Sequence, residues 1–189
     1  MAHILPHWNW PERKGQVTPV HVYTSGDEAE LFLNGKSLGK KKKGPYEYRL
    51  RWDDVVYQPG ELKVVAYKNG IKWAEDKMET TGNASKLSVS ADRPSVAADG
   101  SGLVFITVKV EDKNGRLVPR SINLVNFRIE GPGKIVAVDN GDATSHDPFQ
   151  ASYRKAYNGM CLVIVKAEKG ATGQFVVKAV SKGLKGAEV

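Results

Sequence analysis

Hydrophobic and polar residues alternate along most of this chain. In residues 20–39, for example, Ala29, Leu31 and Leu33 would share one face of a strand, with charged or polar residues between them. Successive strand residues point to opposite sides of a sheet, so this spacing predicts strands with one buried face. Helical periodicity is almost absent, and the pattern therefore predicts a β protein.

Tight-turn signals separate the predicted strands. The pair Asn-Gly occurs five times, at residues 34–35, 69–70, 114–115, 140–141 and 158–159. A two-residue hairpin turn of type I′ needs positive φ at both positions, which Asn and Gly tolerate best. Short strands joined by such turns predict an all-β fold of antiparallel hairpins.

The strand pattern stops at Thr81–Ser85 and then starts again. This TGNAS stretch is short, polar and rich in small residues, as domain boundaries often are. We therefore predict two tandem immunoglobulin-like antiparallel β-sandwich domains, residues 1–84 and 85–189. The single cysteine, Cys161, rules out the disulfide of antibody domains, so only the architecture is predicted.

The basic charge of the chain is spread out. The net charge is +7, with 13 basic and 11 acidic residues in 1–85 and 15 basic and 10 acidic residues in 86–189. The one basic run, Lys40–Lys43, is expected in a solvated loop after a hairpin, so no nucleic-acid partner is predicted. No apolar run approaches the roughly 18 residues of a membrane span, so no membrane insertion is predicted.

Aromatic residues and one acidic loop are the candidate binding features. Trp8 and Trp10 would face the same side of an extended segment and are candidates for carbohydrate contact, whereas Trp52 and Trp73 are expected in a core or an interface. The loop Val138–Gln150 is expected to be structural, to contact another domain or to bind a cation. Asp139 and Asp142 are its candidate ligands, although the calcium spacing of an EF-hand is missing.

Catalytic chemistry is not apparent in the sequence. Glycoside hydrolysis needs two carboxyl groups facing each other across a cleft. Glu28 with Glu30, and Asp53 with Asp54, are the nearest pairs, and both are expected on exposed strands or turns. No catalytic residue, no metal site and no cofactor are therefore predicted.

Several long stretches resemble one enzyme family. They are HILPHWNWP, VTPVHVYTSGDEAELFLNGKSLGK, YRLRWDDVVYQPGELKVVAYKNG, ADRPSVAADGSGLVFITVKVEDKNG, NFRIEGPGKIVAVDNGDATS and RKAYNGMCLVIV. In this order they resemble the region after the catalytic barrel in family 2 glycoside hydrolases, in particular bacterial β-galactosidases of the Bacteroides type.

The resemblance implies a retaining glycosidase as the parent enzyme, whose two catalytic glutamates lie in a (β/α)₈ barrel. Nothing in this chain matches that barrel, so no catalytic residue is carried over and the chain itself is expected to be inactive. Its expected partner is the upstream barrel of its own parent, contacted through the HWNWP entry, with Trp8 or Trp10 near the substrate rim. The expected location of the parent is periplasmic, extracellular or on the cell surface.

Two other functions remain open at this point. A carbohydrate-binding module would tether the parent enzyme to a glycan. A surface adhesion fragment would have no enzyme attached. The start of the chain, MAHILPHWNWP, is unlike a signal peptide and is expected to come from the middle of a longer protein.

Overall fold

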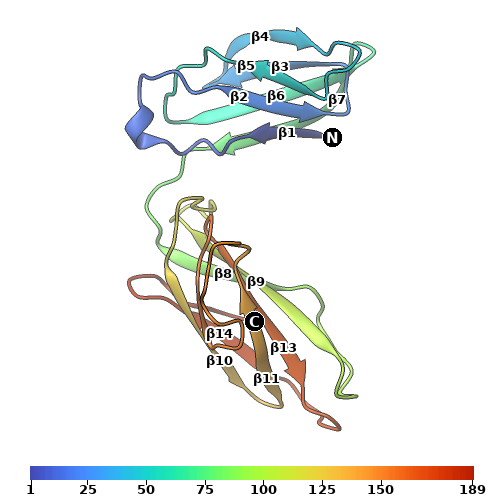
Figure 1. The fold of residues 1–189 in the computed structure, drawn as a ribbon, viewed down its shortest axis with the longest axis vertical. Helices are drawn as coiled ribbons and strands as arrows, with labels where there is room; N and C mark the ends of the chain where they lie inside the picture. Colours follow the sequence, from blue (N-terminus) through green and yellow to red (C-terminus); the bar gives the residue numbers. More distant parts are fainter. The chain divides into compact units, whose positions relative to one another are not determined.

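The computed structural model describes residues 1–189, which divide into two compact units, Met1–Thr80 and Thr81–Val189. Both units are built from antiparallel strand pairs, and the only helix is a single 3₁₀ turn, η1 (Pro11–Arg13) (Figure 1). None of the helical segments has the length and apolar character needed to cross a membrane. The prediction of an all-β fold is confirmed.

Unit 1 is a sandwich of a three-stranded and a four-stranded sheet. The first sheet has the order β1 (Ala2–Leu5), β2 (Val20–Thr24), β5 (Arg49–Trp52). The second has the order β4 (Lys36–Lys42), β3 (Glu28–Leu33), β6 (Glu61–Lys68), β7 (Ile71–Glu79). Strands β4 and β5 are therefore edge strands.

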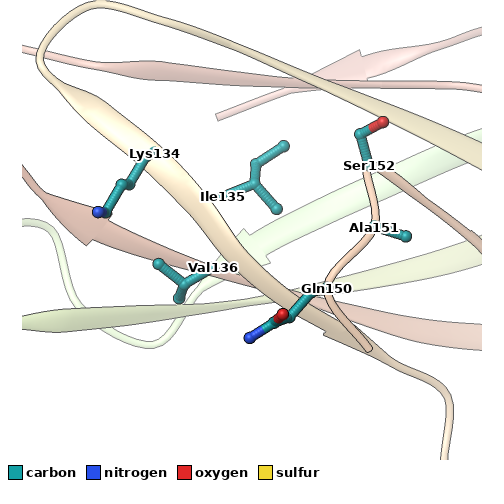
Figure 2. A pocket seen from close by; sticks show the side chains of 6 residues that line it. All are labelled: Lys134, Ile135, Val136, Gln150, Ala151 and Ser152. Atoms are coloured by element: carbon teal, nitrogen blue, oxygen red, sulfur yellow. The ribbon is translucent and has the colours of Figure 1, made fainter. Parts of the chain in front are cut away.

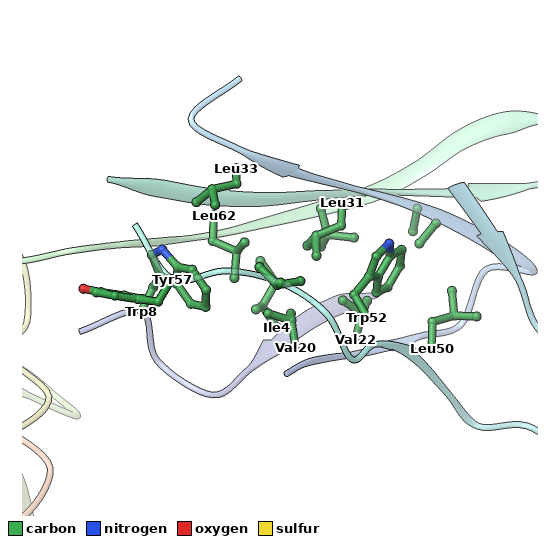
Figure 3. Close-up of a cluster of buried hydrophobic side chains, with 14 residues drawn as sticks. Ile4, Trp8, Val20, Val22, Leu31, Leu33, Leu50, Trp52, Tyr57 and Leu62 are labelled. Carbon is green, nitrogen blue, oxygen red and sulfur yellow. The ribbon is translucent and has the colours of Figure 1, made fainter. Parts of the chain in front are cut away.

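The core of unit 1 lies between its two sheets (Figure 3). Val22 and Trp52 project from the three-stranded sheet toward Leu31 and Val64 of the four-stranded sheet, and all four are buried. Burying a side chain of this size stabilises the folded state by about 1.5–3 kcal/mol. The predicted alternation on β3 is confirmed, with every second residue of Glu28–Leu33 buried.

Unit 2 is a sandwich of two four-stranded sheets. One has the order β12 (Tyr153–Lys155), β10 (Leu124–Glu130), β14 (Val176–Val180), β15 (Ala187–Glu188). The other has the order β11 (Gly133–Asp139), β13 (Met160–Ala167), β9 (Leu103–Glu111), β8 (Lys86–Ala91). Its separate core includes Ile106, Phe127 and Val163, and Cys161 is buried there as a free thiol.

Some local expectations were wrong. The basic run is not in a loop, because Lys40–Lys42 belong to the edge strand β4. Tyr48, Leu50 and Trp52 alternate with charged residues and would share one strand face, but the strand begins only at Arg49, which leaves Tyr48 outside it and exposed. The short strands β1, β12 and β15 were not predicted, since two to four residues are too few to establish an alternating pattern.

Candidate functional site

The two candidate tryptophans of the N-terminal segment lie in different environments. Trp8 is buried in the core of unit 1, with its ring 4.9 Å from that of Tyr57 and its indole N–H donating to the Gln58 carbonyl at 2.9 Å (Figure 3). No face of the Trp8 ring is open to a sugar. Its backbone carbonyl accepts a hydrogen bond from the Thr80 hydroxyl at 2.8 Å, so Trp8 anchors the end of unit 1.

Trp10 is only partly buried and packs against the edge of the same core. Its ring stacks on that of His7, with centroids 4.4 Å apart, and its indole N–H donates to the His7 carbonyl at 2.8 Å. The backbone carbonyl of Trp10 accepts from the Arg13 N–H and so begins the 3₁₀ turn. Of the two residues, only Trp10 offers surface for a contact with another molecule.

Trp73 was expected in a core or an interface, and it does not lie in the core; its place in an interface stays a prediction. Its side chain is 51% exposed on β7, with its indole N–H donating to the Ser25 hydroxyl at 2.9 Å and the Lys68 amine 4.9 Å from its ring centre. The pairing of β6 and β7 shifts register at this point, where Ala66 faces Ala74 but Tyr67 faces Lys72. Trp73 is the extra residue of this bulge, and the neighbouring Ala74 faces the core side instead.

The acidic loop Val138–Gln150 uses its candidate ligands for its own turns. Asp139 accepts from the N–H groups of Asn140 at 2.7 Å and Gly141 at 3.2 Å. Asp142 accepts from the N–H and hydroxyl of Thr144, and these bonds lower the pKa of its carboxyl group. Loop aspartates commonly bond nearby backbone groups in this way.

A buried cation, Arg154, lies beneath this loop and was not recognised in the sequence. Its side chain is 1% exposed and lies 3.5 Å from Asp139, and it donates to the carbonyl of Asp147 at 2.9 Å and to the Asn140 side chain at 3.2 Å. A positive charge at this place disfavours a second cation between Asp139 and Asp142. The geometry therefore supports a structural loop.

The acidic pairs considered for catalysis are engaged in surface contacts. Glu28 lies 3.6 Å from the Lys40 amine, and Glu30 accepts a hydrogen bond from the Ser37 hydroxyl at 2.6 Å. Asp53 pairs with Arg51 at 2.9 Å, and Asp54 is exposed. None of these carboxylates faces another across a cleft, and no cluster of three or more His, Cys, Asp or Glu side chains is placed to hold a metal ion.

A hollow on unit 2 also lacks catalytic groups. It lies between β11 and the segment that leads into β12 (Figure 2). Its lining consists of Lys134, Ile135, Val136, Gln150, Ala151 and Ser152. One amine, one amide and one hydroxyl among aliphatic side chains offer no acid–base pair. The buried Cys161 is no nucleophile either, because burial raises the pKa of its thiol to about 12.

Comparison with known families identifies the family of this chain. The family described as "Glycoside hydrolase family 2 C-terminal domain 5" matches residues 87–189, which is more than half of the chain. The chain belongs to glycoside hydrolase family 2. A second match, to a domain of unknown function, covers residues 15–74. The resemblance to this family is confirmed.

Known relatives of this family-2 chain are whole glycosidases. The β-galactosidase BoGH2A of Bacteroides ovatus is 40% identical over 98% of this chain and 21% of its own length. A putative β-glucuronidase of Formosa agariphila is 35% identical over 88% of this chain and 16% of its own length. The crystal structure of a family 2 member from Bacteroides cellulosilyticus superimposes on the full chain with a TM-score of 0.93 at 34% identity, and 28% of that protein is covered.

This chain therefore spans about a fifth of the length of the curated relatives that it matches. Both units are included in these matches, because the shared region covers nearly the whole chain.

Proposed function

We propose that this chain is a non-catalytic structural region of a family 2 glycosidase, and that the complete enzyme hydrolyses terminal β-galactosides or related glycosides. The observation that carries the proposal is the family match over residues 87–189, in a chain whose candidate acidic pairs make surface contacts with neighbouring side chains. A retaining glycosidase needs two carboxyl groups about 5–5.5 Å apart. That pair would be supplied by a catalytic barrel outside this chain, which is the proposed partner.

The proposed sugar follows from the names of the relatives. One relative is named a β-galactosidase and another a putative β-glucuronidase. The galactoside is proposed first because the β-galactosidase shares more identical residues over more of the chain.

The proposal is tested by a chimera with the Bacteroides ovatus β-galactosidase. Its matching region would be replaced by this chain, and hydrolysis of p-nitrophenyl β-galactoside would be compared with that of the native enzyme and of a truncated enzyme without the region. We expect the chimera to retain activity and the truncated enzyme to lose activity or solubility.

Two results would contradict the proposal. Turnover of the galactoside by the purified chain alone would show that the chain is catalytic. A chimera no better than the truncated enzyme would show that this chain does not support the barrel. A chimera carrying an unrelated pair of β-sandwich domains is the matched control, and it is expected to behave like the truncated enzyme.

A further inference from the structure

A basic groove runs between the two edge strands β4 and β5 on one side of unit 1 (strands labelled in Figure 1). It has a volume of about 360 Å³. Its lining consists of Lys41, Lys42, Glu47, Arg49, Leu50 and Arg51. Four of these six side chains are cationic and one is anionic, so the groove is strongly positive although unit 1 as a whole is close to neutral.

The positive side chains are held in place by unit 1 itself. The Lys41 amine crosses from β4 to β5, where it donates to the Arg51 carbonyl at 2.6 Å and lies 5.4 Å from the centre of the Trp52 ring. The Lys42 side chain is exposed, its residue pairs with Glu28 of β3, and its charge also interacts with the Asp27 carboxylate. The walls of the groove are the edge strands of the two packed sheets, together with Glu47 from the loop between them.

The nearby acidic groups leave the groove positive. The Glu47 carboxylate accepts from the Gly44 N–H at 2.8 Å and caps the loop between β4 and β5. Asp53 pairs with Arg51, and both side chains are more than half exposed, so water screens much of their attraction. The guanidinium of Arg49 has no carboxylate partner within ion-pair distance.

Two exposed tyrosines lie in the loop beside the groove, and the ring centre of Tyr48 is 5.9 Å from the guanidinium of Arg49. Tyr46 is 97% exposed and Tyr48 is 70% exposed, and both belong to the loop between β4 and β5. Each ring has an apolar face open to solvent and a polar hydroxyl group, a combination that suits contact with a ligand. Aromatic rings beside cationic groups suit a ligand with flat apolar faces and negative charges.

We propose that this groove binds an acidic glycan, namely a chain of sugars carrying uronic-acid carboxylates. The cationic side chains would contact the carboxylates, and the tyrosine rings would stack on the apolar faces of the sugars. This inference uses the family membership of the chain and does not depend on which glycoside the complete enzyme hydrolyses. It also differs from the earlier expectation for Trp8 and Trp10, which lie in another segment.

Other anionic partners fit the groove less well. Nucleic-acid binding relies on a broad basic surface, whereas residues 1–85 contain nearly as many acidic residues as basic ones, 11 and 13. A stable protein interface needs an apolar centre and an area of roughly 1,200 Å² or more, and the one apolar side chain lining the groove, Leu50, is buried. The short groove matches a few sugar units, with a volume in the range of small-ligand sites.

The test measures binding of the whole 189-residue chain to a hexamer of galacturonic acid by isothermal titration calorimetry at low salt. A neutral galactose hexamer is the matched probe. We expect saturable binding of the acidic hexamer, at least tenfold weaker binding of the neutral one, and loss of most of the affinity when salt is raised to about 0.5 M, because ions screen exposed charges.

Variants locate the site. Lys41→Gln/Lys42→Gln and, separately, Tyr46→Ala/Tyr48→Ala are each expected to weaken binding at least tenfold. The matched control is Lys113→Gln/Lys182→Gln, which removes two exposed positive charges from unit 2 and is expected to bind like the wild type. Circular dichroism of each variant checks that the fold is kept, and the tyrosine pair is exposed enough to be replaced without disturbing the core.

Several outcomes would overturn the proposal. They are equal binding of the neutral hexamer, no saturable binding of the acidic hexamer, or unchanged binding in both groove variants. Tighter binding of a single-stranded oligonucleotide or of a polyglutamate peptide at the same salt concentration would instead assign the groove to another polyanion.

Discussion

The same dipeptide, Asn-Gly, forms two kinds of turn in this protein. At Asn34, Asn69 and Asn158 the φ angles are 50°, 53° and 51°, and each following glycine is also positive, as a type I′ hairpin requires. Asn114 and Asn140 are not in this conformation. Their N–H groups bond the preceding aspartates Asp112 and Asp139, which form their own local turns.

Asp112 connects the beginning of unit 2 to the turn that follows β9. Its side chain is fully buried and accepts from the N–H groups of Gly82 at 2.9 Å, Asn114 at 2.9 Å and Arg116 at 3.0 Å. Burial raises the pKa of the Asp112 carboxyl group, but the bonds from these three N–H groups outweigh it and place the pKa below its ordinary value. The ionised form therefore stabilises unit 2.

We predict that Asp112→Asn lowers the free energy of unfolding of unit 2 by about 1–3 kcal/mol at neutral pH, because the amide cannot accept from all three N–H groups. A lowered pKa contributes stability above the unfolded value of about 3.9 and loses it as the pH falls through the folded value. Wild-type stability should thus fall below about pH 4, and that of the variant should fall less.

Urea unfolding between neutral and acidic pH measures this difference. Asp53→Asn is the control, because Asp53 is an exposed partner of Arg51 and its loss should change stability by no more than about 0.5 kcal/mol. Equal stability of Asp112→Asn and the wild type at neutral pH would count against the role of Asp112.

At the scale of elements, strand edges and bulges account for most differences between expectation and structure. On β11 the pairing with β13 shifts between Ile135 and Ala137, so that the buried position moves to Val138. A bulge inserts one residue and reverses the side to which later side chains point. Regular alternation therefore predicts that this segment is a strand, but it assigns the wrong residues to the buried face after the bulge.

The lysines of β4 protect an edge that would otherwise be open to pairing with another molecule. We predict that Lys40→Val/Lys42→Val causes self-association of the protein, because it leaves an exposed, β-branched edge strand. Light scattering after size-exclusion chromatography would detect dimers or larger species. Lys113→Val/Lys182→Val, which changes two exposed lysines in turns of unit 2, is the control and should remain monomeric under the same conditions.

For the whole molecule, the important fact is that each unit has its own complete core. The buried apolar residues form two clusters, one within Met1–Thr80 and one within Thr81–Val189. The bonds that end unit 1, from Thr80 to Trp8 and Gly60, stay within that unit. Likewise, Gly82 and Ser85 bond Asp112 and Glu111 in unit 2.

We therefore predict that residues 1–80 and residues 81–189 fold as separate proteins. Each fragment should show a β-type circular dichroism spectrum and one cooperative thermal transition, as small single domains usually do. A fragment cut inside unit 2, such as residues 1–130, serves as a control that should be incompletely folded. Failure of the 81–189 fragment to unfold cooperatively would show that its core is not sufficient.

The sequence alone was enough to identify the fold class and the family of this protein. The alternation of apolar and polar residues and the Asn-Gly turns identified the all-β class, and several long stretches in a fixed order indicated family 2. Both signals could be read from the sequence because they are local and recur along the chain. The buried position of Trp8 and the exposure of Trp73 were decided only in the tertiary structure. They depend on a distant partner, Tyr57, and on a bulge between two strands.

The basic groove could likewise not be predicted from the run of lysines. Its walls come from β4 and β5, which belong to different sheets and meet only when the sandwich closes. The buried Arg154 is a similar case, since its partners Asp139, Asn140 and Asp147 lie on a loop that precedes it. Local pattern determines which residues form strands, and long-range packing determines which side chains meet.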